Sequence, residues 1–352
     1  MSSLFTPLSV RGIEMRNRLW VSPMCQYSAT EGMPNDWHHV HLAQFAAGGA
    51  GLVIAEATAV SPEGRISPDD AGLWTDAQAQ AWAPIVAAIR ARGAVAGVQL
   101  GHAGRKASTT SPLTGGRGSV APDAGGWTTV APSDRAYASF AAPVALDEAG
   151  IEKVVSDFAD AARRAVAAGF QVVEIHAAHG YLLHQFLSPL TNHREDAYGG
   201  SLENRARLLV RVTEAARAAS PDIAVFVRFS ATDAADGGWN VDDTVAAARL
   251  AGAAGADLID VSSGGLVPEQ HIVPGPGYQV EYAATVRRET GLLVSAVGMI
   301  DDPALAESIV AEGRADAVMS GREWLRDPHY GLRAAAALGA DSPAPAQYSR
   351  AY

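Results

Sequence analysis

Short apolar segments alternate with longer amphipathic segments along this chain of 352 residues. The short segments have the length and composition of buried strands, and the longer ones repeat apolar residues at helical spacing. Strands are predicted at 19–22, 51–55, 95–100, 172–176, 224–229, 257–261, 293–297 and 315–320. Helices are predicted at 38–47, 76–92, 147–168, 202–219, 241–252, 280–290, 303–312 and 323–338.

This alternation indicates parallel strands joined by helical crossovers. Eight strands are the number that closes a (β/α)8 barrel, so the predicted fold is an α/β TIM barrel in a single domain over residues 1–352. A doubly wound open sheet is the alternative, because it shows the same alternation.

Several residues predict where helices begin, end or break. Asp147 can cap the helix that follows it, and Gly169 can close that helix. Asp302 and Pro303 form a cap and first-turn proline for a later helix. Pro84 lies inside the predicted helix 76–92, where a kink or a restart is expected.

Three segments do not belong to the alternation. Residues 4–18 resemble a small hairpin that turns at Gly12 and would plug the amino-terminal end of the barrel. Residues 107–145 are rich in Ser, Thr, Gly and Pro and follow the third strand, so they are expected to cap the active-site face. Residues 341–352 are expected to form an extended tail.

Composition and charge exclude several classes of protein. Apolar residues make up 48% of the chain, which predicts a substantial core, and the net charge of −11 argues against nucleic acid and anionic membranes as partners. Residues 1–18 lack the apolar core of a secretory signal, and no apolar stretch approaches the ~20 residues of a membrane span. A single cysteine, Cys25, excludes an internal disulfide and fits a reducing compartment. A cytoplasmic location is therefore expected.

The most informative motif is His176-Ala177-Ala178-His179-Gly180-Tyr181, at the end of a predicted strand. The carboxyl ends of parallel strands are where barrel enzymes carry their active sites. Two imidazoles can hold an oxygen that gains negative charge, and a phenol can deliver a proton. The trio therefore suits polarisation of a carbonyl group with protonation of a neighbouring atom.

Two other interpretations of the histidines remain open at this stage. Imidazole is a common metal ligand, but Glu174 is the only further ligand type close by, and a metal site needs more. The histidines can also be structural residues of a loop, with no role in chemistry.

A phosphate site is predicted at the ends of strands seven and eight. Gly298 and Gly321 follow these strands and let backbone N–H groups approach an anion closely. The helix that begins near Arg322 adds its positive end, and the guanidinium adds a full charge. A phosphate-bearing cofactor or substrate is therefore expected.

The chain resembles the old yellow enzyme family of FMN-dependent ene-reductases, and in particular its thermophilic-like group. The resemblance covers nearly all of the chain. The segments that carry it are Ser-Pro-Met-Cys-Gln-Tyr at 22–27, Gln-Leu-Gly-His-Ala-Gly-Arg-Lys at 99–106, the 176–181 motif, Phe-Leu-Ser-Pro at 186–189, Asn-His-Arg at 192–194 and Tyr-Gly-Gly-Ser-Leu-Glu-Asn-Arg at 198–205.

This resemblance implies that FMN lies across the carboxyl end of the barrel. Its reactive edge would lie along the backbone of Ser22, Pro23 and Met24, with Ala57 nearby. Gln99 would bind the pyrimidine part of the ring, and Arg228 would place positive charge beside it, where the reduced ring is anionic. The remaining residues implied to hold the cofactor are the phosphate ligands Gly298, Gly321 and Arg322.

The resemblance also implies the reaction. NADPH or NADH would reduce FMN, and an α,β-unsaturated carbonyl compound would then enter the same pocket. His176 and His179 would bind its carbonyl oxygen while Tyr181 protonates the α carbon, with Tyr27 reaching the substrate. Cys25 would lie beside the flavin, tune its potential and line the substrate pocket.

Two alternative functions remain, and an oligomeric state is also expected. A cofactor-free barrel lyase or aldolase would use the phosphate site for a phosphorylated substrate, and a non-catalytic FMN carrier would need neither histidine nor Tyr181. In the relatives that the tail resembles, an arginine crosses a dimer interface. Arg350 is therefore expected to enter the neighbouring active site of a homodimer or homotetramer.

Overall fold

The computed structural model describes residues 2–116 and 118–352, and within them eight parallel strands close into a barrel. Around its wall the strands follow in chain order: β3 (Leu19–Val21), β4 (Leu52–Ala59), β5 (Val95–Gly101), β8 (Val172–Ala177), β9 (Ala224–Ser230), β10 (Leu258–Ser262), β11 (Leu293–Val297) and β12 (Ala317–Ser320). The barrel closes where Val318 of β12 pairs with Leu19 of β3. The predicted TIM barrel is confirmed, and the open sheet is wrong because an open sheet leaves two edges unpaired.

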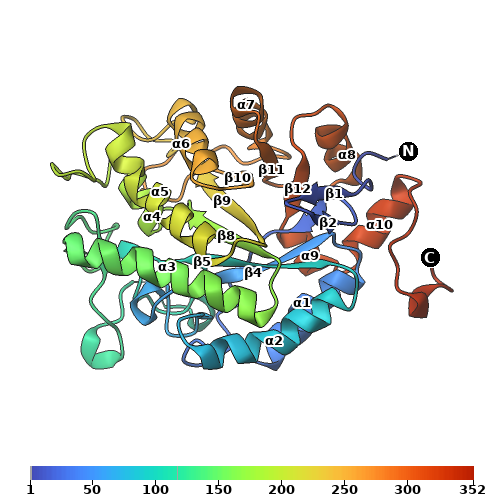
Figure 1. Ribbon diagram of the computed structural model, residues 1–352, viewed down its shortest axis with the longest axis horizontal. Helices are drawn as coiled ribbons and strands as arrows, with labels where there is room; N and C mark the ends of the chain where they lie inside the picture. Colours follow the sequence, from blue (N-terminus) through green and yellow to red (C-terminus); the bar gives the residue numbers. More distant parts are fainter. Residues whose placement is uncertain (1, 117) are drawn as a thin grey trace.

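Helices surround the barrel, as Figure 1 shows. Those that follow the predicted pattern are α1 (Asp36–Ala47), α2 (Asp76–Arg90), α3 (Glu148–Ala168), α5 (Leu202–Ala219), α6 (Val241–Ala253), α7 (Val280–Thr290) and α8 (Pro303–Ala311). In the described residues no helix is both long and apolar enough to cross a membrane.

The last predicted helix is instead two helices, α9 (Arg322–Arg326) and α10 (Tyr330–Ala337). Pro328 lies between them, and the residue before a proline is disfavoured in the helical region. Asp327 accordingly has extended backbone angles, φ −135° and ψ 94°. The prediction of one helix over 323–338 is therefore wrong, and this proline is the reason.

Helix ends follow the predicted signals, whereas the prediction of a restart inside α2 is wrong. The Asp147 side chain accepts a hydrogen bond from the Gly150 amide, and Gly169 closes α3 with φ +92°. Asp302 caps α8 in the same way through the Leu305 amide. Helix α2 runs through Pro84 as one helix. Pro84 and Gln80 are both exposed, so water can reach the Gln80 carbonyl that the proline leaves without a donor.

An apolar layer fills the amino-terminal half of the barrel interior. It is closed by the hairpin of β1 (Leu8–Val10) and β2 (Ile13–Met15), which turns at Arg11 and Gly12 with φ values of 51° and 75°. Such left-handed pairs form the tight turn that matches strand twist. The layer comprises Leu8, Val10, Met15, Trp20, Leu52, Ile54, Val95, Val172, Ala224, Phe226, Leu258, Ala317 and Met319.

Strand β4 contains an extra residue. Ala55 pairs with Val98 of β5, but Ala57 pairs with Gln99, so Glu56 is bulged out of the register. Glu56 lies 3.1 Å from His38 Nε2 on α1 and accepts a hydrogen bond from the Gln26 amide. The bulge therefore turns this carboxylate toward α1 and away from the interior.

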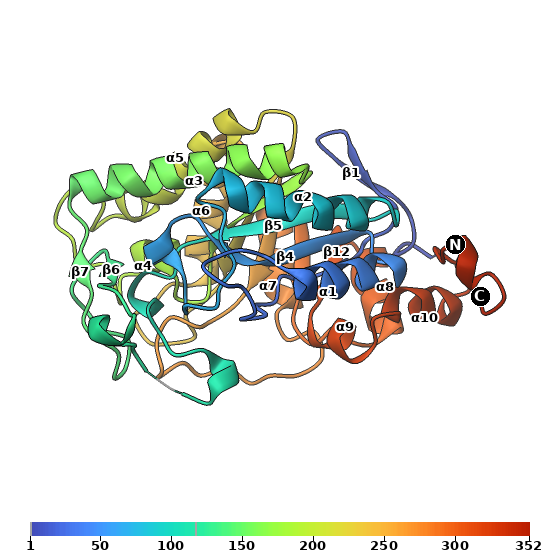
Figure 2. The ribbon, with the colours of Figure 1, turned by 90° about the horizontal axis from the view of Figure 1, so that it is seen from below.

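The two ends of the barrel differ, as the rotated view shows. In Figure 2 the hairpin and both termini lie at one end, and strands β6 (Val130–Ala131) and β7 (Val144–Ala145) lie at the other. These two strands belong to the segment 107–145, which otherwise contains only short 3-10 turns among its described residues. The tail is not fully extended, since Ala346–Tyr348 form a 3-10 turn and Tyr348 packs against His329.

Candidate active site

Strand β8 and the turn after it bring the predicted catalytic trio together. The ring of His176 meets that of His179 edge to face at a centroid distance of 5.1 Å, and that of Tyr181 at 4.9 Å. His176 and Tyr181 line a pocket of about 220 Å³, whose wall also includes His102 and Asp70. Two of the three predicted side chains therefore border one space at the carboxyl end of the barrel, and the ring of His179 packs against that of His176.

Both imidazoles are neutral near pH 7. Burial, and then the charge of Arg228, hold the pKa of His176 well below its usual value, and the same two causes act on His179. His176 Nδ1 accepts a hydrogen bond from the Ala178 amide at 3.3 Å, so its proton lies on Nε2. His179 Nε2 lies 2.8 Å from the Ser262 hydroxyl. His176 is thus a neutral donor, which binds an oxygen without bringing a full charge.

Tyr181 is held in its protonated form. Burial raises the pKa of this phenol well above its usual value, and Cys25 and Tyr27 add to the effect. Lys106 Nζ lies 5.1 Å from the Tyr181 ring centroid and 4.8 Å from that of Tyr137 in the capping segment. A neutral phenol in this position can donate a proton to a substrate.

Lys106 also fastens the turn itself. Its ammonium donates hydrogen bonds to the carbonyls of His179 and Gly265, at 2.8 and 2.9 Å. His179 has a left-handed φ of 58°, and a side chain on Gly180 would strike the Gly265 carbonyl at 2.2 Å. Burial lowers the pKa of Lys106 to about 8. Sequence reasoning assigned this lysine no role, because its partners are remote in the chain.

A polar layer lies in the barrel interior below the trio. Gln99 Nε2 donates to Glu174 Oε1 at 2.7 Å. Arg228 Nε lies 3.0 Å from Asp260 Oδ2, and its Nη1 donates to the Ser22 hydroxyl at 3.1 Å. Gln99 and Arg228 are therefore both near the end of the barrel where the flavin ring is expected.

Two carboxyl groups in this layer face one guanidinium. The pKa of Glu174 is raised to about 8. Burial is the largest cause, and the charge of Asp260, which raises the pKa, outweighs that of Arg228, which lowers it. Glu174 Oε2 has no hydrogen-bond partner among the described residues. Glu174 therefore carries its proton near neutral pH. The described residues contain no cluster of three or more His, Cys, Asp or Glu side chains that could hold a metal ion.

The predicted phosphate residues line a second cleft of about 630 Å³. Gly298 has φ +125°, and a side chain there would strike Gln279 Nε2 at 2.8 Å. A side chain on Gly321 would come within 3.2 Å of Met24 Sδ. Arg322 lines the same cleft, while the acidic Asp301 in its wall is paired with Arg326 at 2.9 Å. Close backbone approach and a guanidinium fit a phosphate group.

The segment after β3 borders the larger cleft. Ser22 and Met24 line the larger cleft, and Cys25 and Tyr27 are hydrogen-bonded to each other through their side chains. Burial, with Asp70 and Glu56, raises the pKa of the Cys25 thiol well above its usual value. Cys25 is therefore a neutral thiol rather than a thiolate.

The remaining predicted positions divide into two groups. Pro23 is half-buried in the same segment, and Ala57 borders the smaller cavity beside Gln99 of β5. Arg350 is exposed and belongs to the tail, which lies at the hairpin end of the barrel. Arg350 does not reach the active site of its own chain.

Sequence comparison decides the family. Residues 3–340 match the family described as NADH:flavin oxidoreductase / NADH oxidase. The chain belongs to this flavin oxidoreductase family. The NADPH dehydrogenase of Listeria innocua is 46% identical over 354 residues, with 100% of each chain covered. The NADPH dehydrogenase of Bacillus subtilis is 42% identical over 352 residues, with 99% of each chain covered.

Solved structures of the flavin oxidoreductase family agree. Morphinone reductase superposes with a TM-score of 0.81 at 29% identity, covering 97% of this chain and 91% of that one. The old yellow enzyme homologue of Zymomonas mobilis gives 0.79 at 29% identity, covering 97% and 94%. The resemblance to the old yellow enzyme family is confirmed, and the protein is an FMN-dependent oxidoreductase. Its place in the thermophilic-like group stays a prediction.

Proposed function

We propose that the protein reduces the activated C=C bond of α,β-unsaturated carbonyl compounds at the expense of NADPH or NADH. The observation that carries this proposal is that neutral His176 and protonated Tyr181 line one pocket, with the ring of His179 packed against that of His176. Relatives named NADPH dehydrogenase and a structural neighbour named morphinone reductase support it. FMN, when bound, would supply the hydride chemistry that links the nicotinamide to the β carbon of the substrate.

The histidines bind the carbonyl oxygen of the substrate. His176 carries its proton on Nε2 and is neutral, so it can donate to an oxygen that gains charge as the β carbon accepts hydride. His179 is held by Ser262 on one ring nitrogen, which leaves Nδ1 for the substrate. Such donors stabilise the transition state more than the ground state.

Tyr181 protonates the α carbon. Its phenol keeps its proton at neutral pH because burial raises its pKa. Lys106 lies against the ring and holds the preceding turn, so the phenol enters the cavity in a fixed orientation. Tyr27 and Cys25 border the substrate from the segment after β3.

The residues that would hold FMN lie on six strands or directly after them. Gln99 would bind the pyrimidine ring, and Arg228 would balance negative charge on its reduced form. The backbone of residues 22–24 would line the ring, with Ala57 beside it. The phosphate would lie in the 630 Å³ cleft against Gly298, Gly321 and Arg322.

We also infer that the protein is a homodimer or homotetramer in which Arg350 completes the neighbouring active site. Arg350 is exposed, and Figure 2 shows the C-terminus at the opposite end of the barrel from β6 and β7, so Arg350 could enter an active site only in another copy of the chain. Tyr348 and Tyr352 flank it, and aromatic residues and arginine are enriched at interfaces.

Both rivals are tested by one experiment. Purified protein should be yellow and show flavin absorbance, anaerobic NADPH should bleach it, and cyclohexenone should restore the colour. A colourless protein that releases no flavin would support a lyase, against the family assignment. Bound flavin that neither NADPH nor cyclohexenone changes would support a flavin carrier and overturn the proposed activity.

A further inference from the structure

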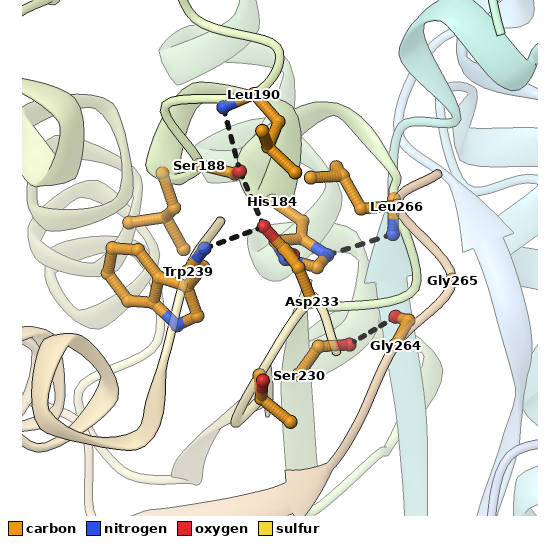
Figure 3. A network of polar contacts seen from close by, with 12 residues as sticks. His184, Ser188, Leu190, Ser230, Asp233, Trp239, Gly264, Gly265 and Leu266 are labelled. Carbon is orange, nitrogen blue, oxygen red and sulfur yellow. Dashed lines mark hydrogen bonds and ion pairs between the residues drawn. The ribbon is translucent and has the colours of Figure 1, made fainter. Parts of the chain in front are cut away.

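A buried histidine and carboxylate lie next to each other beside the turn at Gly180, and Figure 3 shows them with their polar neighbours. They are His184, on the short helix α4 (Leu182–Leu187), and Asp233, which follows β9. His184 Nε2 lies 2.8 Å from Asp233 Oδ1, and both side chains are 0% exposed. Neither residue lines the cavity of the trio, and the mechanism above uses neither.

The position of the ring proton on His184 follows from its contact with the Gly180 amide. Its Nδ1 accepts a hydrogen bond from the Gly180 amide at 2.9 Å, so that nitrogen carries no proton. The proton therefore lies on Nε2, the nitrogen that is 2.8 Å from Asp233 Oδ1. Burial alone would raise the pKa of Asp233, but the hydrogen bonds from His184, Ser188 and Trp239 hold it below its usual value. A neutral imidazole thus connects a carboxylate to a backbone amide.

Asp233 anchors this connection to two further elements. Its Oδ2 accepts from the Ser188 hydroxyl at 2.6 Å, just beyond the end of α4, and from the Trp239 amide at 2.7 Å. Figure 3 shows Asp233 between His184, Ser188 and Trp239. The carboxylate therefore fixes both α4 and the loop after β9 to the imidazole.

The backbone amides of His179 and Gly180, in the turn before Tyr181, are hydrogen-bonded to different side chains. The His179 amide donates to the Ser230 hydroxyl at 2.9 Å, and Ser230 donates to the Gly264 carbonyl. The Gly180 amide, directly before Tyr181, is held by His184 instead. The backbone before Tyr181 is therefore held by a different side chain from the backbone of His179.

We propose that His184 and Asp233 are positioning residues for Tyr181, which hold the Gly180 amide so that the phenol stands over the cavity beside His176. The proposal rests on the proposed function, because it assigns the pair a role in the protonation step. A displacement of about 1 Å at a reacting group can cost on the order of 10²-fold in rate.

The test uses His184→Gln and Asp233→Asn in the FMN-loaded protein, with Ser230→Ala as the matched control at the other half of the turn. Rapid-mixing experiments measure flavin reduction by NADPH and flavin reoxidation by cyclohexenone separately. We expect both substitutions to slow reoxidation by about 10-fold or more while reduction changes by less than about 2-fold. Hydrogen exchange of the flavin-free protein should become faster in peptides that contain Gly180 and Tyr181, and less so in Ser230→Ala.

A double substitution separates positioning from general support of the fold. If His184 acts through Tyr181, then His184→Gln should add little to the loss already caused by Tyr181→Phe. Equal slowing of both half-reactions, an additive loss in the Tyr181→Phe background, or a parental reoxidation rate in both single variants would each overturn the proposal. Should His184→Gln fail to fold, the same cycle with Asp233→Asn gives the answer. A parental protein that cyclohexenone does not reoxidise would overturn the proposed function instead.

Discussion

Gln99 on β5 and Glu174 on β8 are hydrogen-bonded inside the barrel, with Gln99 Nε2 donating to Glu174 Oε1 at 2.7 Å. This bond directs the carboxyamide that is expected to bind the flavin ring. It also occupies one oxygen of the Glu174 carboxyl group. Arg228 is paired with Asp260 and does not form an ion pair with Glu174.

Glu174→Gln should raise stability in a pH-dependent way. The pKa of Glu174 is raised from 4.5 to about 8, so the folded protein loses stability relative to the unfolded chain as pH rises from 4.5 to 8. Below 4.5 both states are protonated, and the substitution should have little effect. Denaturant unfolding at pH 5 and pH 9 measures this difference, with exposed Glu214→Gln as control. The same gain at both pH values would contradict it.

Replacing both His176 and His179 with Ala should leave FMN bound but slow enone reduction strongly. Loss of one donor of this kind can cost about 10²–10³ in rate. Steady-state rates with cyclohexenone, beside the flavin content of the purified variant, measure the effect. A double variant that turns over at nearly the parental rate would show that the imidazoles do not polarise the acceptor.

Tyr181→Phe should slow reoxidation by the enone far more than reduction by NADPH, because only the enone step takes a proton from the phenol. General acid catalysis contributes about 10²–10⁴-fold, although water can replace part of it. Stopped-flow traces of the two half-reactions check this. Equal slowing of both would indicate a binding or structural role.

Cys25→Ala should keep the fold and the flavin but shift the flavin's reduction potential and turnover. The thiol is neutral and bonded to Tyr27, so its removal changes the polarity beside the expected ring position. Equilibration with a redox dye measures the potential. An unchanged potential would make Cys25 a packing residue.

Deleting residues 348–352 should raise the KM for the enone and weaken association, while FMN stays bound. Sedimentation and steady-state kinetics measure the two effects, and Arg350→Ala in the intact tail separates the charge from the contacts. If the truncated protein keeps its oligomer size and KM, the tail does not complete a neighbouring site.

The barrel could be predicted because each of its strands contains a short apolar segment, although β4 continues to Ala59, past its predicted end at residue 55. Helix α4 was missed because Leu182–Leu187 is too short to establish a helical period. The break at Pro328 was missed because the apolar period continues on both sides of it.

The cluster at 176–181 could be predicted because its residues are close in sequence: His176 and Tyr181 line one pocket, and His179 packs against His176. The cleft at Gly298 and Gly321 could be predicted because they follow neighbouring strands of the barrel. Lys106 contacts His179 across 73 positions, and Gln99 contacts Glu174 across 75, and no periodicity encodes such pairs. Likewise, His184 looks like one more residue of an apolar run until the structure places Asp233 beside it.

The bulge at Glu56 keeps one carboxylate out of the barrel interior. In regular alternation after Leu52 and Ile54, Glu56 would point inward and lie beside Gln99. Glu174 and Asp260 already compete there for Arg228, and another buried carboxylate without a counter-ion would cost several kcal/mol. One extra residue gives that position to Ala57 and turns the acid toward His38. A single-residue deletion in this strand would therefore change the electrostatics under the flavin without altering any residue expected to contact it.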